Sequence, residues 1–242
     1  NDIPKNITNT QIVTTNTNRF GIYAQDLISF TEKIKLLAGI RWSWQESQAD
    51  TNNLVKNTIT EGAKKLDNAF SPKLGLVYQP TKDMSVFASY SNSFTPNTGT
   101  TVDLQPIKPS IIDQYEAGIK KDFWKGVLST NITVYQITNS NLAQTAEFKA
   151  DGTTPNTDTS IKTLSGETKS KGVEIDVTAR PIEGLNIIAG YSYNDMRYSK
   201  TTGANGSFIE GDRLVRTPAN TANLSFFYTL QSGALKGMSF GA

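Results

Sequence analysis

The chain has 242 residues, of which 37% are hydrophobic, and its 24 Lys and Arg nearly balance its 22 Asp and Glu. This net charge of +2 gives no electrostatic reason to expect binding to nucleic acid or to a membrane surface. The absence of Cys and His excludes thiolate and imidazole catalysis and the metal sites built on those side chains.

Apolar and polar residues alternate in segment after segment. In chain order, the clearest cases are residues 36–44, 115–123, 173–179, 185–193 and 222–230. A period of two predicts β-strands with one apolar and one polar face, and no segment shows the 3.6-residue period of a helix. We therefore predict an all-β chain of about ten strands, which begin near Phe20, Ile34, Ser71, Met84, Ile111, Val127, Gly172, Leu185, Thr221 and Leu235. A strand of about 10 residues can cross a bilayer although no stretch is apolar throughout.

The links between these strands alternate in length. Short, turn-like links at 31–33, 79–83, 124–126, 181–184 and 231–234 alternate with long polar links at 47–69, 93–110, 139–171 and 199–220. An up-and-down antiparallel sheet places alternate links at opposite ends of the strands. The pattern therefore predicts one end with tight turns and one with long loops, as in transmembrane barrels with short periplasmic turns and long extracellular loops.

The two predicted faces differ in character. Five charged side chains fall in mid-strand on the polar face and are predicted to line a water-filled lumen: Arg41, Glu116, Lys120, Glu174 and Asp176. Aromatic residues on the apolar face gather near both strand ends, namely Phe30, Tyr78, Phe123 and Tyr228 by the short links and Trp42, Trp44, Tyr115 and Tyr191 towards the long ones. Two aromatic girdles around an aliphatic band are typical of membrane barrels.

Two other interpretations fit parts of the pattern. A soluble extracellular β-sandwich, acting as a binding module, would also alternate apolar and polar residues. Glu174 and Asp176 lie about 7 Å apart by strand rise, close to the spacing of glycosidase carboxylates, but no pocket signature accompanies them.

A family resemblance rests on short motifs in a fixed order. These are FGIYAQD at 20–26 with LAGIR at 37–41, FSPKLGLVY at 70–78, FASYSNSFTP at 87–96, YEAGIK at 115–120, SKGVEI at 170–175 and GYSY at 190–193. Together they resemble the barrel of TonB-dependent outer-membrane receptors, especially ferric-siderophore receptors of the ferrichrome type. The resemblance implies a 22-stranded barrel in the cell outer membrane, closed by an N-terminal plug domain.

The resemblance also implies a transport role and no enzymatic activity. We expect residues 1–242 to be a single barrel fragment without the plug and the final strands, in contact with outer-membrane lipid. The implied cargo is a ferric siderophore, with iron carried as the chelate rather than by a metal site or cofactor of the protein. Energy would come from TonB–ExbB–ExbD through the missing N-terminal region. Cobalamin or an oligosaccharide remains an alternative cargo, and the lack of His disfavours haem.

Ligand capture in such a receptor would use the long loops and the lumen wall beneath them. The candidate contacts are Phe94, Phe148, Tyr198 and Phe208 for stacking, and Arg213 and Arg216 for an anionic chelate.

Overall fold

The computed structural model describes residues 9–201 and 209–242; Phe208 lies outside the described residues. The described residues form eleven strands and one short 3-10 turn, η1 (Trp124–Gly126), and none of them forms a helix long and apolar enough to cross a bilayer. The strands are β1 (Gln11–Ser29), β2 (Ile34–Asn53), β3 (Thr58–Thr60), β4 (Lys65–Thr81), β5 (Met84–Thr95), β6 (Ser110–Phe123), β7 (Leu128–Thr145), β8 (Lys162–Ala179), β9 (Leu185–Lys200), β10 (Asn220–Thr229) and β11 (Ser239–Gly241).

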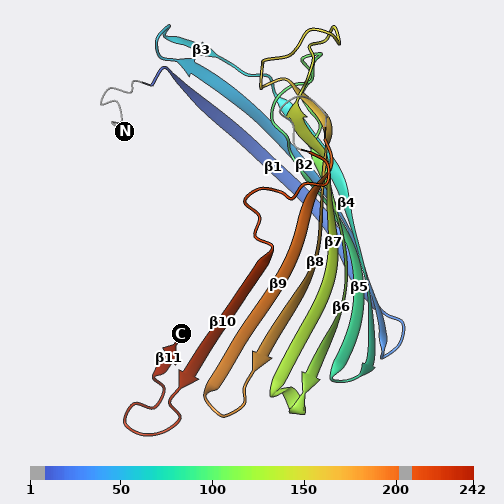
Figure 1. Ribbon diagram of the computed structural model, residues 1–242, viewed down its shortest axis with the longest axis vertical. Helices are drawn as coiled ribbons and strands as arrows, with labels where there is room; N and C mark the ends of the chain where they lie inside the picture. The colour runs from blue at the N-terminus through green and yellow to red at the C-terminus, as the bar shows by residue number, and fades with distance from the viewer. Residues whose placement is uncertain (1–8, 202–208) are drawn as a thin grey trace. The chain divides into compact units, whose positions relative to one another are not determined.

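The strands follow chain order in one sheet, β1-β2-β4-β5-β6-β7-β8-β9-β10-β11, and β3 pairs with β2 beside this path. By its contacts the chain divides into a smaller unit, residues 1–23 and 41–70, and a larger unit, residues 24–40 and 71–242. Within the larger unit every ladder from β4 to β11 is antiparallel. Its short turns lie at one end of the strands and its long loops at the other (Figure 1), which confirms the predicted up-and-down arrangement.

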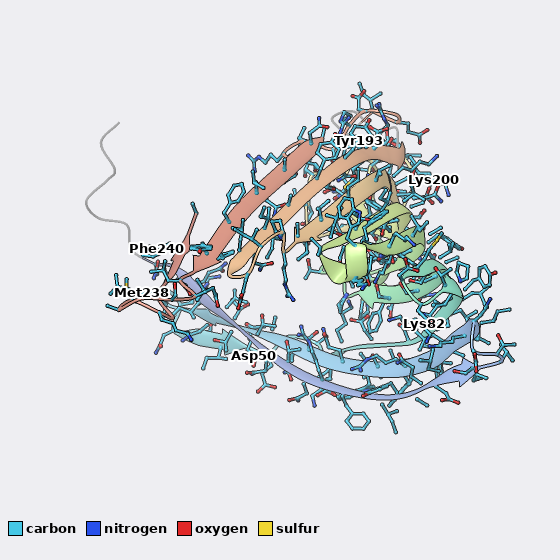
Figure 2. All side chains as sticks on the ribbon, turned by 90° about the horizontal axis from the view of Figure 1, so that it is seen from below. Asp50, Lys82, Tyr193, Lys200, Met238 and Phe240 are labelled. Atoms are coloured by element: carbon cyan, nitrogen blue, oxygen red, sulfur yellow. The ribbon has the colours of Figure 1, made fainter. Side chains whose placement is uncertain are left out.

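The ladders of the larger unit carry the predicted faces across neighbouring strands. Ala88 pairs with Ala117, Ala117 with Val134, and Val134 with Val173, so short apolar side chains share one face. Side chains project from both faces of this sheet (Figure 2). The apolar face is open to its surroundings, with Val134 50% exposed. A continuous exposed face of this kind is unfavourable in water and is suited to lipid.

On the polar face, aromatic rings lie over glycines of the neighbouring strand. A Cβ atom on Gly118 would overlap the Phe87 ring, and one on Gly172 would overlap the Tyr135 ring and the carbonyl oxygen of Tyr193. Glycine is required at these two positions because no side chain fits beneath the ring. The ring in turn covers backbone that the glycine would leave bare.

Several strands are longer than the sequence pattern predicts. β7 continues to Thr145 and β8 begins at Lys162, ten residues before the predicted start at Gly172. About half of the predicted 139–171 loop is therefore a hairpin extension, paired from Asn139 with Thr168 to Thr145 with Lys162. Both faces of this extension are rich in polar residues, so the alternation that marks a strand in contact with lipid is missing there.

The last predicted strand is partly wrong. Residues 234–237 form a turn, closed by hydrogen bonds from the Leu230 amide to the Met238 carbonyl (2.9 Å) and from the Gly237 amide to the Leu230 carbonyl (2.9 Å). Gly233 and Gly237 have φ values of +84° and +91°, which favour glycine and bend the chain back. The strand itself is only Ser239–Gly241.

Gly172 lies beneath the Tyr135 ring, and its close packing against that ring on the polar face can be tested with a matched pair of substitutions. Gly172→Ala is expected to destabilise the protein by about 1–3 kcal/mol, because the added methyl group overlaps the Tyr193 backbone. Gly75→Ala is the control, since its Cβ would lie an ordinary 3.5 Å from the Leu37 Cβ and should be neutral or slightly stabilising. Urea unfolding of the protein in lipid vesicles measures both free energies of unfolding; equal effects of the two substitutions would contradict the close packing of Gly172 under the Tyr135 ring.

Candidate ligand site and membrane-facing wall

Four of the five charged residues predicted to line the lumen share the polar face of the larger unit. Lys120 pairs in register with Asn131, and Asn131 with Asp176, so these three side chains form one row across β6, β7 and β8. The Asn131 Nδ2 donates a hydrogen bond to the Asp176 Oδ2 (3.2 Å). The Lys120 ammonium lies 5.5 Å from the centroid of the Phe87 ring, within reach of a cation–π interaction.

Glu116 and Glu174 extend this polar wall. The Gln114 Nε2 donates to one Glu116 carboxylate oxygen (2.5 Å) and the Ser89 hydroxyl to the other (3.4 Å). Glu174 is exposed and pairs in register with Thr133. The larger unit thus presents carboxylates and an ammonium on its polar face. Such a face is suited to a water-filled lumen.

Arg41, the fifth predicted lumen residue, belongs to the smaller unit. Its guanidinium lies across Gly21 and its Nε donates to the Ser43 hydroxyl (2.8 Å). The Phe20 and Trp42 rings, in the same unit, meet edge to face with centroids 6.2 Å apart.

The β5–β6 and β7–β8 loops are joined to each other by backbone hydrogen bonds. The Thr100 amide donates to the Ser160 carbonyl (3.1 Å), and the Lys162 amide donates to the Thr100 carbonyl (2.7 Å). The Asn97 side chain donates to the Asn141 carbonyl (3.1 Å). Ile107 is completely buried beneath this junction, 0% exposed. The two loops therefore form one structured body at the long-loop end, which the sequence could not indicate because Asn and Thr are ordinary loop residues.

The predicted stacking residues lie in different environments. Phe148 is 38% exposed in the β7–β8 loop, where it forms a β-bridge with Pro155. Phe94 pairs with Ile111, on the same face as Tyr90 and the apolar residues. Tyr198 pairs with Thr168 on the polar side, but it is only 8% exposed. The structure does not gather these three aromatic residues into one cluster.

The two predicted arginines also differ. The Arg213 Nη1 lies 3.2 Å from the Asp195 Oδ1, and its Nη2 donates to the Asn194 carbonyl (2.6 Å). Asp195 also accepts from the Arg197 Nε (2.9 Å). Arg216 is exposed and has a positive φ of 62°. Arg216 is therefore the arginine that the loop presents to solvent, whereas Arg213 is held against a carboxylate.

A resident metal centre has no support in the described part of the chain, where no group of three or more carboxylates could hold a metal ion. A hollow of about 680 Å³ opens on the apolar face between Tyr115 and Tyr193. A polar wall on one side, an exposed apolar face on the other and long loops at one end define a segment of an outer-membrane barrel wall.

The chain belongs to the TonB dependent receptor-like, beta-barrel family, which matches all of residues 1–242. This family consists of transport receptors of the outer membrane, so the predicted recognition, fold class and location are confirmed.

Known proteins similar to this chain are named as metallophore receptors. The metal-pseudopaline receptor CntO of Pseudomonas aeruginosa is 28% identical, covering 90% of this chain and 29% of the receptor. The ferrioxamine B receptor of Salmonella typhimurium is 28% identical, covering 92% of this chain and 29% of the receptor. The alcaligin receptor FauA of Bordetella pertussis shares the fold, with a TM-score of 0.70 at 22% identity over 95% of this chain and 37% of FauA. The chain thus spans under a third of the length of the two sequence relatives.

Two lysine substitutions at adjacent positions of β7 can test which face of the sheet meets lipid. Ile132→Lys is expected to destabilise the complete receptor by about 2–4 kcal/mol, because it places an ammonium at mid-height on the lipid side. Asn131→Lys is the control and should change stability little, since the new ammonium faces the wet side near Asp176. Unfolding in lipid vesicles distinguishes the two; a larger effect for Asn131→Lys would reverse the assignment of the faces.

The β7–β8 loop contains a carboxylate whose titration reports on a turn. The Thr154 hydroxyl and the Thr153 and Thr154 amides (3.0 and 2.8 Å) donate to Asp151 and lower the pKa of its carboxyl from 3.8 to about 2. Because the folded pKa is depressed, the stabilisation is full above pH 3.8 and is lost as the pH falls through about 2.

The Thr154 amide signal of the complete receptor, followed by NMR, should therefore stay constant from pH 7 to about 4 and titrate near pH 2. Asp151→Asn should abolish this titration. A midpoint near 4 would show that the turn does not hold the carboxylate.

Proposed function

We propose that the complete receptor binds a ferric siderophore at the cell surface and imports it, with energy from TonB–ExbB–ExbD. The observation that carries this proposal is the match of the whole chain to the receptor barrel family, together with relatives named for siderophores. The polar wall supports it, because a bulky hydrophilic chelate needs a wet path through an otherwise apolar membrane.

Iron is carried in the chelate, and the protein contributes hydrogen bonds, charge and shape. Exposed groups on the polar face, including Lys120 and Glu174, would line the route below the loops. Arg216 would meet a chelate of negative charge at the surface, since a guanidinium binds oxygen anions through paired N–H donors. A ferrichrome-type chelate is the first candidate cargo.

The similarity to a metal-pseudopaline receptor favours a second candidate. In that case the cargo is a metallophore loaded with a metal other than iron, and the same wall and loops would serve it. The two candidates differ in the loaded metal and not in the transport route.

Uptake in a receptor-deletion strain tests the proposal. Cells that regain the complete gene should accumulate ⁵⁵Fe supplied as ferrichrome or ferrioxamine B, and accumulation should stop when TonB is removed. The same cells supplied with ⁶³Ni or ⁶⁵Zn metallophores test the second candidate. Accumulation of neither iron nor another chelated metal, with the receptor present in the membrane, would refute a metallophore cargo.

The two arginines of the β9–β10 loop provide a matched pair for ligand binding. Arg216→Gln is expected to weaken binding of an anionic ferric chelate about tenfold or more, since a hydrogen bond to a charged group contributes about 1.5–3 kcal/mol. Arg213→Gln should change affinity much less, because that guanidinium is held by Asp195. Glutamine removes the charge and keeps an unbranched polar side chain at the positive φ of Arg216. Fluorescence titration with the purified complete receptor measures both; a larger loss for Arg213→Gln would contradict the assignment.

A further inference from the structure

Every short turn of the larger unit carries one exposed basic residue. The β1–β2, β4–β5, β6–β7, β8–β9 and β10–β11 turns contain, in that order, Lys33, Lys82, Lys125, Arg180 and Lys236. We call these five residues the turn row. Consecutive turns are two strands apart, so the members of the row are spaced about 10 Å along the end of the sheet. Figure 2 is seen from this end and labels Lys82.

The surroundings of the turn row do not neutralise it. The turns, with the three strand residues on either side of each, contain seven basic residues and four carboxylates. Beside the row these are Lys35, Lys121, Glu32, Asp83, Asp122 and Glu183. Asp83 is held by Lys121, and Asp122 accepts a hydrogen bond from the Ser129 hydroxyl (2.6 Å). Within the described part of the chain, no member of the turn row forms an ion pair.

The position of the turn row points to a partner beneath the membrane. Lys121 alternates with Phe123 on the apolar face of β6, but this lipid-side cation is already held by Asp83. Arg180 falls on the polar side, four residues after Asp176 of β8. The other four members lie in turns, beyond the last residue of a strand. Because the short turns of such barrels are periplasmic, the unpaired cations face the periplasm.

The β6–β7 turn adds an aromatic side chain to this end of the sheet. Trp124 is 72% exposed, and Trp124 and Lys125 have positive φ values of 50° and 58°. Hairpin turns with two such residues normally use Asn and Gly, because a large side chain disfavours this backbone. The exposed indole therefore has no evident role in forming the turn, which indicates a role in binding. Its flat apolar face and single N–H donor suit a sugar ring.

We propose that the turn row binds an anionic glycan–peptide polymer that lies in the periplasm beneath the outer membrane. Such a polymer offers carboxylates to the basic residues and sugar rings to Trp124. The spacing of about 10 Å exceeds the Debye length of about 8 Å at physiological salt, so each cation acts separately. A small anion meets one cation, whereas an extended polymer meets several, and their effects combine. The proposal depends on the orientation of the wall and not on the identity of the cargo.

Co-sedimentation of the complete receptor with peptidoglycan sacculi tests the proposal. The receptor is held in nanodiscs of zwitterionic phosphatidylcholine, which leave the short-turn end accessible. Sacculi should carry the receptor down at low salt and less of it at raised salt, because exposed charges are screened. Sacculi whose carboxylates have been converted to amides should bind much less. Equal binding to intact and amidated sacculi, or binding to neither, would overturn the proposal.

Substitutions in three turns then locate the contact. Lys82→Gln, Lys125→Gln and Lys236→Gln combined should weaken binding to sacculi roughly tenfold, since each exposed ion pair contributes up to about fivefold. The matched control removes the same charge from exposed lysines towards the long-loop end, with Lys108→Gln, Lys149→Gln and Lys171→Gln combined. This control should bind as the unaltered receptor does. Equal losses in the two triple variants would show a general attraction of charge and no site at the turns.

Trp124→Asn separates binding from folding. Asn adopts a positive φ more readily than Trp, so the free energy of unfolding in lipid vesicles should stay the same or rise. Binding to sacculi should nevertheless fall severalfold. Lower stability with unchanged binding would make Trp124 a membrane anchor and contradict its place in the site.

Phosphatidylglycerol tests the other source of negative charge, the lipid headgroups of the inner leaflet. Native mass spectrometry compares its retention with that of phosphatidylcholine. A preference for phosphatidylglycerol that the turn triple variant loses, together with no binding to sacculi, would assign the row to headgroups and overturn the proposal. If a triple variant fails to assemble, the comparison of intact with amidated sacculi still decides, because it uses the unaltered receptor.

Discussion

Backbone hydrogen bonding is the constraint on which the rest of this structure depends. A bilayer contains no water to satisfy amide and carbonyl groups, so each spanning strand must pair with its neighbours throughout. The antiparallel ladders from β4 to β10 do this in the larger unit. Once two residues are paired, their side chains share a face. Register alone therefore decides which residues meet lipid and which meet water.

This division explains why most of the wall could be predicted from the sequence. Inside the bilayer one face of the sheet meets lipid and the other meets water, so the polarity of a residue indicates its face. Apolar Ile132 lies on the lipid face and polar Asn131 on the water face. Beyond the bilayer both faces meet water and the pattern disappears, which is why the extension from Asn139 to Thr168 was predicted as a loop. The turn at 234–237 was not predicted for another reason: two glycines with positive φ outweigh a strand-like composition.

The candidate ligand residues depend on contacts that no local pattern encodes. Arg213 and Arg216 are three residues apart in one loop and look equivalent in the sequence. Their difference comes from Asp195, which lies on β9 and is brought next to Arg213 only by the fold. The same holds for Phe94, whose side of the sheet follows from its pairing with Ile111.

The junction between the β5–β6 and β7–β8 loops has a consequence for how receptors of this kind can diversify. Backbone pairing of Thr100 with Ser160 and Lys162 ties the length and path of one loop to those of the other. An insertion or deletion in either loop must preserve this pairing or dissolve it, and dissolving it would uncover Ile107. Among the described residues, those of the β9–β10 loop at 209–219, which include Arg216, make no backbone hydrogen bond or β-bridge to that junction. Changes in selectivity are therefore accommodated more readily in the β9–β10 loop, while the joined pair changes only as a unit.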